Sequence, residues 1–222
     1  MYRRYSIYYT PCGALAEAGA AWLGWDVALG GTVAHPIIDG LDLATMTKRP
    51  RKYGLHATFK PPMALAQGRT EAELIRAVEH IAKTLTPVRL DRLTVSQLGS
   101  FLALTVVGKT DTLNNLAAHL VENLDPFRAP STVEELTRHY QKPLTPSQEQ
   151  NLVQWGYPNV MDEFRFHITL TGPLKDTSAM LPIVAAHFAP VLPAPFMIDH
   201  LTVAGEDAAG MFHSIARIPL AR

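Results

Sequence analysis

The feature that most constrains the fold of this chain is a short segment that occurs twice. Residues 53–60 read Tyr-Gly-Leu-His-Ala-Thr-Phe-Lys, and residues 163–170 read Glu-Phe-Arg-Phe-His-Ile-Thr-Leu. Each copy contains His-x-Thr followed by an apolar residue, and each is expected to form a β-strand whose side chains alternate between two faces. The predicted polar faces carry His56, Thr58 and Lys60 in the first strand and Arg165, His167 and Thr169 in the second.

The similarity between the two copies extends well beyond the histidines. Each copy is followed by proline, a helical pattern and two further strands, which begin with Leu-Asp-Arg-Leu-Thr-Val at 90–95 and Ile-Asp-His-Leu-Thr-Val at 198–203. The spacing from His56 to His167 equals that from Gly99 to Gly210 (167 − 56 = 210 − 99 = 111). The pattern indicates a duplicated unit, around 53–107 and 164–218, and an approximate two-fold axis that brings both histidines to one cleft.

The order strand, helix, strand, strand within each copy favours an α+β fold. Apolar periodicity predicts helices over 14–24, 71–84, 111–124 and 178–189, and strands over 4–9, 88–95, 101–107, 164–171, 196–203 and 211–218. A capping box, Thr70 with Glu73, marks the start of the second helix. Residues 26–53 lack periodicity and are expected to be irregular. We expect one bilobal domain over 1–222, with two antiparallel-rich sheets flanking a central cleft and helices outside.

Residues 126–163 interrupt the repeat. Capping boxes from Ser131 to Glu134 and from Thr145 to Gln148 predict two short helices. This helical insertion would form a small cap. Its Tyr157 would either stack on a base or sugar or close a loop onto the core, and the sequence leaves both open.

The charge balance limits the possible ligands. Lys plus Arg and Asp plus Glu are each 20, so the formal net charge is zero and no broad basic field for nucleic acid exists. An anionic ligand must be held locally. The run Lys-Arg-Pro-Arg-Lys at 48–52 is either a solvated turn or a place where Arg51 or Lys52 attracts an anion.

Cysteine usage and hydropathy point to a cytoplasmic location. The single Cys12 excludes an internal disulfide and a cysteine-based zinc site, and it suits a reducing compartment. The first nine residues alternate like a strand and lack the apolar run of a signal peptide. Apolar runs also stay below the roughly 18 residues of a membrane span. A soluble cytoplasmic protein without a membrane partner is expected.

Two histidines at one cleft suit the cleavage of a phosphodiester. Because the ordinary pKa of histidine is about 6.5, one imidazole would take a proton from water or a hydroxyl while the other protonates the leaving oxygen. Thr58 and Thr169 would donate to the non-bridging oxygens, whose charge grows in the transition state. Removal of either histidine should lower the reaction rate severely, and removal of either threonine should lower it less.

Other reaction classes have little support. No carboxylate lies on the predicted polar faces, and the strands lack His-x-His spacing, so no metal is expected. Gly-x-Ser-x-Gly, P-loop and dinucleotide motifs do not occur, and no cofactor is expected. An alternative is a binding module that holds a nucleotide or an RNA end in the cleft without turnover.

These motifs resemble the two-histidine (2H) phosphoesterase superfamily, which has two His-x-Thr/Ser-apolar motifs on a pseudo-symmetric, bilobal α+β fold. Residues 51–62, 155–158 and 164–172 resemble its bacterial phosphonate-metabolism branch, often encoded near carbon–phosphorus lyase genes. The resemblance covers nearly the whole chain. It implies metal-independent hydrolysis or formation of a cyclic phosphate or 2′-5′ type phosphodiester. The implied partner is a small phosphorylated substrate, and an RNA end is the second possibility.

The resemblance also implies roles for particular residues. His56 and His167 would be catalytic, and Thr58 and Thr169 would bind phosphate. Lys60 and Arg165 are added from strand alternation as groups that offset the charge of the phosphodiester. Members of the superfamily often have an aromatic residue beside the cleft, for which Tyr8, Tyr53 and Tyr157 are candidates. The acid and the base, and the oligomeric state, are not assigned by the sequence.

Overall fold

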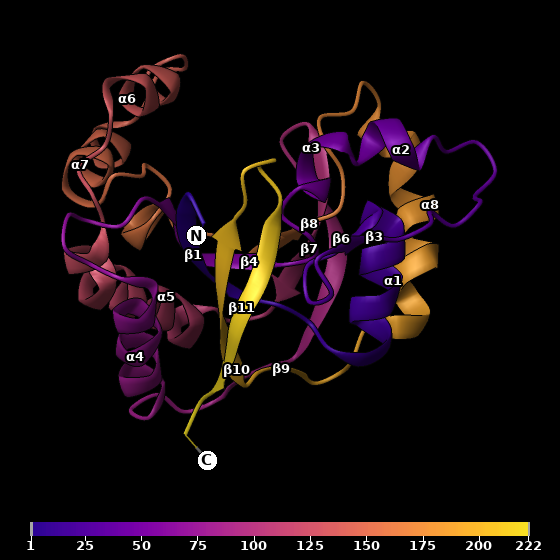
Figure 1. Cartoon of the computed structure of the whole chain (residues 1–222). Helices are drawn as coiled ribbons and strands as arrows, with labels where there is room; N and C mark the ends of the chain where they lie inside the picture. Colours follow the sequence, from indigo (N-terminus) through magenta and orange to yellow (C-terminus); the bar gives the residue numbers. More distant parts are fainter. Residues whose placement is uncertain (1, 222) are drawn as a thin grey trace.

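The structure of the protein is a computed structural model that describes residues 2–221, so the two ends of the domain expected over 1–222 lie outside it. The principal strands are β1 (Arg4–Tyr9), β4 (Ala57–Met63), β6 (Arg92–Leu98), β7 (Phe101–Val107), β8 (His167–Thr169), β10 (His200–Glu206) and β11 (Phe212–Pro219). They form one sheet in the order β11-β10-β1-β4-β8-β7-β6 (Figure 1). Two small sheets have two strands each. One consists of β2 (Trp25–Asp26) and β3 (Gly31–Thr32), and the other of β5 (Val88–Leu90) and β9 (Phe196–Ile198).

Eight α-helices and three short 3-10 helices occur within the described residues. The α-helices are α1 (Gly13–Leu23), α2 (Leu43–Met46), α3 (Lys48–Arg51), α4 (Glu71–Ala82), α5 (Asp111–Leu124), α6 (Val133–His139), α7 (Pro146–Trp155) and α8 (Thr177–Phe188). The 3-10 helices are η1 (Asp125–Phe127), η2 (Met161–Glu163) and η3 (Ala189–Val191). The expected α+β class is confirmed. None of the helices within residues 2–221 is long and apolar enough to cross a membrane.

The duplicated units run in the same element order but exchange strands. The first unit is β4-α4-β5-β6-β7 and the second is β8-α8-β9-β10-β11. The hairpin β6-β7 pairs with β8 of the second unit, whereas β10-β11 joins β4 of the first unit through β1. Each half of the sheet is therefore built from both units, and neither half can close its hydrogen-bond ladder with one unit alone.

Two strand pairings mark a pseudo-two-fold axis. Ala57 pairs with Ile168, and these residues directly follow the two histidines of the repeat. Arg89 pairs with Met197, and each of these stands two residues before the aspartate of its Asp-x-Leu-Thr-Val segment. Because equivalent residues of the two units face each other at both places, the axis passes through both pairs.

The expectation of two separate sheets is wrong in one respect. The two halves are hydrogen-bonded into a single seven-stranded sheet, although the join between β4 and β8 is only the pair Ala57 and Ile168. Two separate sheets would leave unpaired backbone groups on two facing edges, and the join satisfies some of them.

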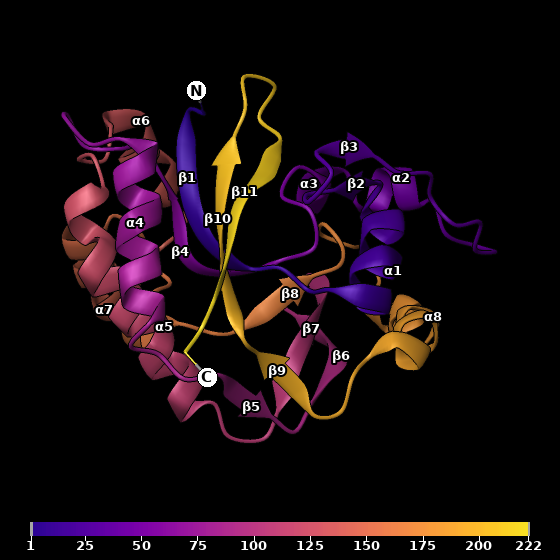
Figure 2. The same cartoon turned by 60° about the horizontal axis from the view of Figure 1, so that its bottom comes forward.

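Helices cover the sheet in two groups. In both views α4, α5, α6 and α7 lie on one side of the molecule and α1, α2, α3 and α8 on the other (Figures 1 and 2). Helix α4 contacts β10 and β11, while α8 contacts β6 and β7, so each helix packs on the hairpin of the other unit. The capping box of Thr70 with Glu73 is confirmed, and Leu74, Val78 and Ile81 of the predicted stripe are buried.

The insertion contains two helices, as expected, with one corrected start. Thr145 and Gln148 form the predicted capping box of α7. Helix α6, however, is capped by Thr132 with Glu135, one residue later than the predicted Ser131 with Glu134. Both hydroxyl residues have a glutamate three positions on, so only the backbone geometry selects the cap. The segment 26–53, expected to be irregular, contains the short elements β3, α2 and α3.

Candidate active site

Strand alternation places the two His-x-Thr motifs on one side of the sheet. Ala57 and Ile168 are buried in the core, and their neighbours along β4 and β8 turn the other way. The residues that are half-buried on the opposite face are His56, Thr58, His167 and Thr169. The core takes the apolar set, Leu55, Ala57 and Phe59 from the first motif and Phe166, Ile168 and Leu170 from the second.

The register across the axis brings these four polar residues together. Since Ala57 and Ile168 are partners in an antiparallel pair, His56 lies opposite Thr169 and Thr58 lies opposite His167. Diagonal positions in such a pair are about 7–8 Å apart, and the two histidines occupy one diagonal. The motifs that are far apart in the sequence therefore form a compact square of two imidazoles and two hydroxyls.

Both imidazoles are oriented by the same backbone contact. His56 Nδ1 donates to Gly54 O at 2.9 Å, and His167 Nδ1 donates to Arg165 O at 2.8 Å. A carbonyl oxygen only accepts, so each Nδ1 carries the proton of the neutral ring and Nε2 is the basic nitrogen. Thr58 Oγ1 donates to His56 Nε2 at 3.1 Å. The two units thus present their Nε2 atoms in equivalent ways.

Aromatic rings pack closely around His56. The ring of Tyr8 lies 4.0 Å from the imidazole between centroids, and the ring of Tyr53 lies 5.6 Å from it. Burial by these neighbours, with a smaller contribution from the charge of His167, lowers the pKa of His56 from 6.5 to about 4, although the Gly54 carbonyl opposes the shift. His56 is therefore neutral near pH 7.

Tyr8 and Tyr53, two of the three expected aromatic residues, belong to this packing. Tyr8 is wholly buried, and its hydroxyl has no hydrogen-bond partner among the described residues. Burial raises the pKa of Tyr8 well above 10, which keeps the phenol neutral. Tyr53 is half-buried and packs against His56 and Phe212. Tyr8 thus lies beneath His56, and Tyr53 lies nearer the surface.

The other candidates on this side lie farther out. Arg165 is exposed and contributes its carbonyl to the orientation of His167. Tyr157 of the insertion is half-buried and packs edge-on against His139 at 5.2 Å. Burial raises the pKa of Tyr157, Tyr53 raises it further, and Arg49 lowers it. Tyr157 of the insertion is therefore sensitive to the charges of Tyr53 and Arg49.

The prediction that Lys60 shares the face of His56 and Thr58 is wrong. Tyr8 pairs with Thr58, but the preceding Ile7 pairs with Lys60, so Phe59 is an extra residue that forms a β-bulge. A bulge reverses the alternation beyond it. Lys60 is consequently turned into the interior and is only 2% exposed.

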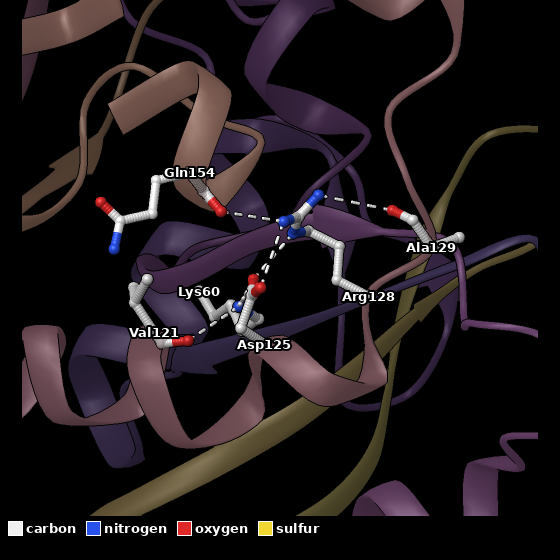
Figure 3. Close-up of polar contacts among 6 residues, drawn as sticks. All are labelled: Lys60, Val121, Asp125, Arg128, Ala129 and Gln154. Carbon is white, nitrogen blue, oxygen red and sulfur yellow. Dashed lines mark hydrogen bonds and ion pairs between the residues drawn. The ribbon is translucent and has the colours of Figure 1, made fainter. Parts of the chain in front are cut away.

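The ammonium group of Lys60 is the buried member of a cluster whose acidic centre, Asp125, is partly exposed (Figure 3). Lys60 Nζ donates to Val121 O at 3.0 Å and lies 3.4 Å from Asp125 Oδ1. Arg128 binds the same carboxylate through two nitrogens, at 2.8 and 3.1 Å, and donates to Gln154 O of α7 at 3.1 Å. Burial lowers the pKa of Lys60 to about 8, although Asp125 opposes the shift. The cluster joins β4, α5 and the insertion.

The cationic run at 48–52 divides between two roles. Arg51 is structural, because its guanidinium donates to Leu23 O at 2.8 Å and Ala44 O at 2.7 Å. Lys48, Arg49 and Lys52 instead line a pocket of about 420 Å³. Sequence reasoning named only Arg51 and Lys52 from this run and missed Lys48 and Arg49, because helical spacing does not separate Lys48 from Arg51, three residues later.

Possible metal ligands are scattered over the molecule. From residue 2 to residue 221, no three or more side chains of His, Cys, Asp or Glu are grouped so that they could hold a metal ion. The expected independence from metals stays a prediction that activity measurements must test.

The fold and this shared face define a class of protein, a duplicated α+β chain in which each copy supplies one His-x-Thr strand. This is the arrangement that the resemblance to the two-histidine superfamily implied. The model of the family described as "Protein of unknown function (DUF1045)" matches residues 58–213, which is more than half of the chain. The protein belongs to this family.

Two curated relatives are similar over almost the whole chain. Ribose 1,5-bisphosphate phosphokinase PhnN of Janthinobacterium sp. (strain Marseille) is 36% identical over 228 residues, which cover 97% of this chain and 50% of that protein. The protein of the same name from Laribacter hongkongensis (strain HLHK9) is 31% identical over 219 residues, covering 97% and 51%. The chain thus spans about half the length of these relatives.

Solved structures are similar at low sequence identity. Escherichia coli LigT complexed with 3′-AMP aligns over 100% of both chains with 14% identity and a TM-score of 0.49. TT0787 of Thermus thermophilus aligns over 98% of this chain and 97% of its own, with 16% identity and a TM-score of 0.46. Kluyveromyces marxianus Usb1 aligns over 99% of both chains, with 13% identity and a TM-score of 0.42.

Proposed function

We propose that the protein is a two-histidine phosphoesterase that hydrolyses a small cyclic phosphate by general acid–base catalysis. The observation that carries this proposal is the square of His56, Thr58, His167 and Thr169 around the Ala57–Ile168 pair. Each imidazole is held through Nδ1 by a carbonyl, so its Nε2 is the nitrogen that exchanges protons. Two such groups about one phosphate provide both proton transfers of a phosphodiester cleavage.

The lowered pKa of His56 supports His56 as the base and His167 as the acid. A ring that is neutral near pH 7 serves as the base, so His56 Nε2 removes a proton from water as the water oxygen bonds to phosphorus. His167 takes part in this step as the imidazolium, with a proton on Nε2 in addition to the one that Nδ1 donates to Arg165 O. Its Nε2–H protonates the ester oxygen on the other side of phosphorus as the ring P–O bond breaks, which leaves the ring neutral. The product is a phosphate monoester with a free hydroxyl group.

The threonines support the phosphoryl oxygens. Thr58 donates to His56 Nε2 in the free protein, and its hydroxyl turns to a non-bridging oxygen when substrate is bound. Thr169 lies opposite His56 and supplies the second donor. Because the oxygens gain charge as the water attacks, these hydrogen bonds strengthen in the transition state. Arg165, exposed beside His167, adds long-range charge compensation.

The relatives support a phosphorylated ribose as the substrate class. Their printed name is that of a kinase of ribose 1,5-bisphosphate, and this chain corresponds to about half of each of them. A domain in the same polypeptide as such a kinase is suited to catalyse the reaction that precedes or follows the kinase reaction. We propose a ribose cyclic phosphate of phosphonate metabolism as the substrate and a nucleoside 2′,3′-cyclic phosphate as the nearest alternative.

A panel of cyclic phosphates assayed with and without EDTA tests this function. We expect turnover of at least one ribose or nucleoside cyclic phosphate to a monoester, at the same rate with and without the chelator. Loss of turnover in EDTA would establish a metal-dependent hydrolase instead. Binding of the panel without turnover would favour a module that holds a nucleotide or an RNA end.

The pH profile tests the assignment of His56 as the base. Because the pKa of His56 is about 4, the acid limb of kcat/KM is expected to fall as the pH drops through about 4, rather than near 6.5. The measurement is kcat/KM against pH, with circular dichroism to confirm that the protein remains folded at the lowest pH.

Tyr53→Ala supplies a matched variant for this measurement. Removing the Tyr53 ring admits water to the imidazole of His56. The pKa of His56, and with it the pH at which kcat/KM falls, are therefore expected to rise toward 6.5. A wild-type limb already near 6.5, or a limb that stays in place in the variant, would contradict the assignment.

A further inference from the structure

The pocket beside the His-x-Thr square has an unusual charge. Its volume is about 420 Å³, and its walls come from α2, α3 and the loop after β8. The lining residues are Thr45, Met46, Lys48, Arg49, Lys52, Gly172 and Pro173. Three of these are cationic and none is acidic. In a chain of zero net charge, such a grouping is a local anion site rather than part of a broad basic field.

These cations are available to a ligand. Within residues 2–221, none of Lys48, Arg49 and Lys52 takes part in an ion pair. The carboxylate that Lys52 influences is Glu206, whose pKa is held low first by its hydrogen bonds to Arg4 and then by more distant cations that include Lys52. Lys52 also lies 4.6 Å above the ring of Tyr53. The pocket therefore keeps an uncompensated positive charge.

The pocket adjoins the proposed catalytic residues on both sides. Gly172 is three residues beyond Thr169, a separation of at most about 10 Å in extended chain. Gly172 N donates to Met46 O at 2.7 Å, which fixes α2 against this segment. A Cβ at Gly172 would approach Met46 O to 3.3 Å, so glycine permits the close contact.

On the other side, aromatic contacts connect the pocket to His56. Lys52 lies over Tyr53, and Tyr53 packs against His56 at 5.6 Å. The charge of Arg49 acts on Tyr157, a residue that Tyr53 also influences. The pocket and the square are thus neighbours, joined through Tyr53, and one small ligand with two phosphates could contact both.

We propose that the pocket of Lys48, Arg49 and Lys52 binds a phosphate monoester carried by the substrate in addition to its cyclic phosphate. This rests on the proposed phosphoesterase function. A monoester dianion matches a pocket with three cations, and the arginine fork binds two phosphate oxygens at once. The preferred substrate is therefore a small cyclic phosphate with a separate terminal phosphate, rather than an oligonucleotide, which requires a longer basic track.

Matched substrates test the assignment. Adenosine 2′,3′-cyclic phosphate with and without a 5′-phosphate differ only in the group that the pocket would bind. We expect wild type to prefer the 5′-phosphorylated compound in kcat/KM by about 10-fold or more. Arg49→Gln and Lys52→Gln are expected to bring the ratio close to one, whereas Lys175→Gln, an exposed lysine outside the pocket lining, should leave it as in wild type.

A binding measurement separates this inference from the function on which it rests. Ribose 5-phosphate is titrated by calorimetry into His167→Ala and into His167→Ala combined with Arg49→Gln. Binding that is lost with Arg49 would support the pocket even if no cyclic phosphate is turned over by wild type. Turnover without preference for the 5′-phosphate, together with binding of ribose 5-phosphate that is indifferent to Arg49, would overturn it. A preference for a cyclic-phosphate oligonucleotide over the 5′-phosphorylated mononucleotide would also overturn it.

Discussion

Replacing His167 with alanine is expected to lower kcat on the active cyclic phosphate by about 10²–10⁴-fold, and replacing His56 should cost a similar factor. In the proposed mechanism His56 accepts the proton of water and His167 donates to the leaving oxygen, so each variant would lose one proton transfer. Because the two histidines act on the same step, the double variant is expected to be little worse than either single variant. Initial rates at saturating substrate measure these effects.

The matched control is His80→Ala, which removes an exposed histidine of α4 far from the repeat motifs along the chain. Its kcat should stay within about two-fold of wild type, as surface substitutions are usually mild. Circular dichroism should show that all variants remain folded. If His56→Ala or His167→Ala retained most of the wild-type kcat, the shared-phosphate mechanism would be wrong.

Asp125→Asn is expected to lower the free energy of unfolding by about 3–5 kcal/mol at pH 7, because it removes the acidic partner of a buried ammonium. The substitution leaves Lys60 and Arg128 facing each other without the carboxylate between them (Figure 3). Urea denaturation measures the loss. Glu122→Gln, which removes an exposed carboxylate from the preceding helix α5, is the control and should change the free energy of unfolding by no more than about 0.5 kcal/mol.

The loss in Asp125→Asn should depend on pH. The pKa of Lys60 in the folded protein is about 8, below its ordinary 10.5. Below pH 8 the ammonium is charged in both the folded and the unfolded chain, and the cost of burying it is fully present. As the pH rises from 8 toward 10.5, the folded chain loses the proton first, so stability is regained. In the variant this recovery should begin at a lower pH, since Asp125 raises the pKa of Lys60.

A second variant distinguishes the charge effect from a packing effect. Lys60→Met in the Asp125→Asn background removes the unpaired ammonium and keeps an apolar stem, so it should restore much of the lost stability. An equal loss of stability at pH 7 and pH 9 in Asp125→Asn, with no recovery in the double variant, would refute the electrostatic account.

The duplicated unit and most helix limits could be predicted because local patterns determine them. Helix α5 occupies Asp111–Leu124, the predicted limits, because its apolar spacing matches the helical period. The capping box at Thr70 fixes the start of α4 within one turn of chain. The predicted strand 164–171 was too long, because only His167–Thr169 pairs as β8 and the following residues bond singly to Leu102.

The position of Lys60 could not be predicted, because it depends on another strand. The repeat alone puts Lys60 with His56 and Thr58, but β1 pairs with β4 in a register that leaves Phe59 as an extra residue. Which residue of a strand becomes the bulge is decided by the partner's hydrogen bonds and side chains. The structural role of Arg51 could not be predicted either, because its guanidinium donates hydrogen bonds to carbonyl groups of α1 and α2.

The sequence by itself determined that two His-x-Thr strands exist, that each has an apolar and a polar face, and that the units around them are copies. These properties follow from side-chain period and spacing, which are local. Only the tertiary structure decided that the strands meet at Ala57 and Ile168, that Lys60 is buried, and that a cationic pocket adjoins the square. Those outcomes depend on strand register and on contacts between distant segments, for which backbone pairing and burial across the whole core set the energy.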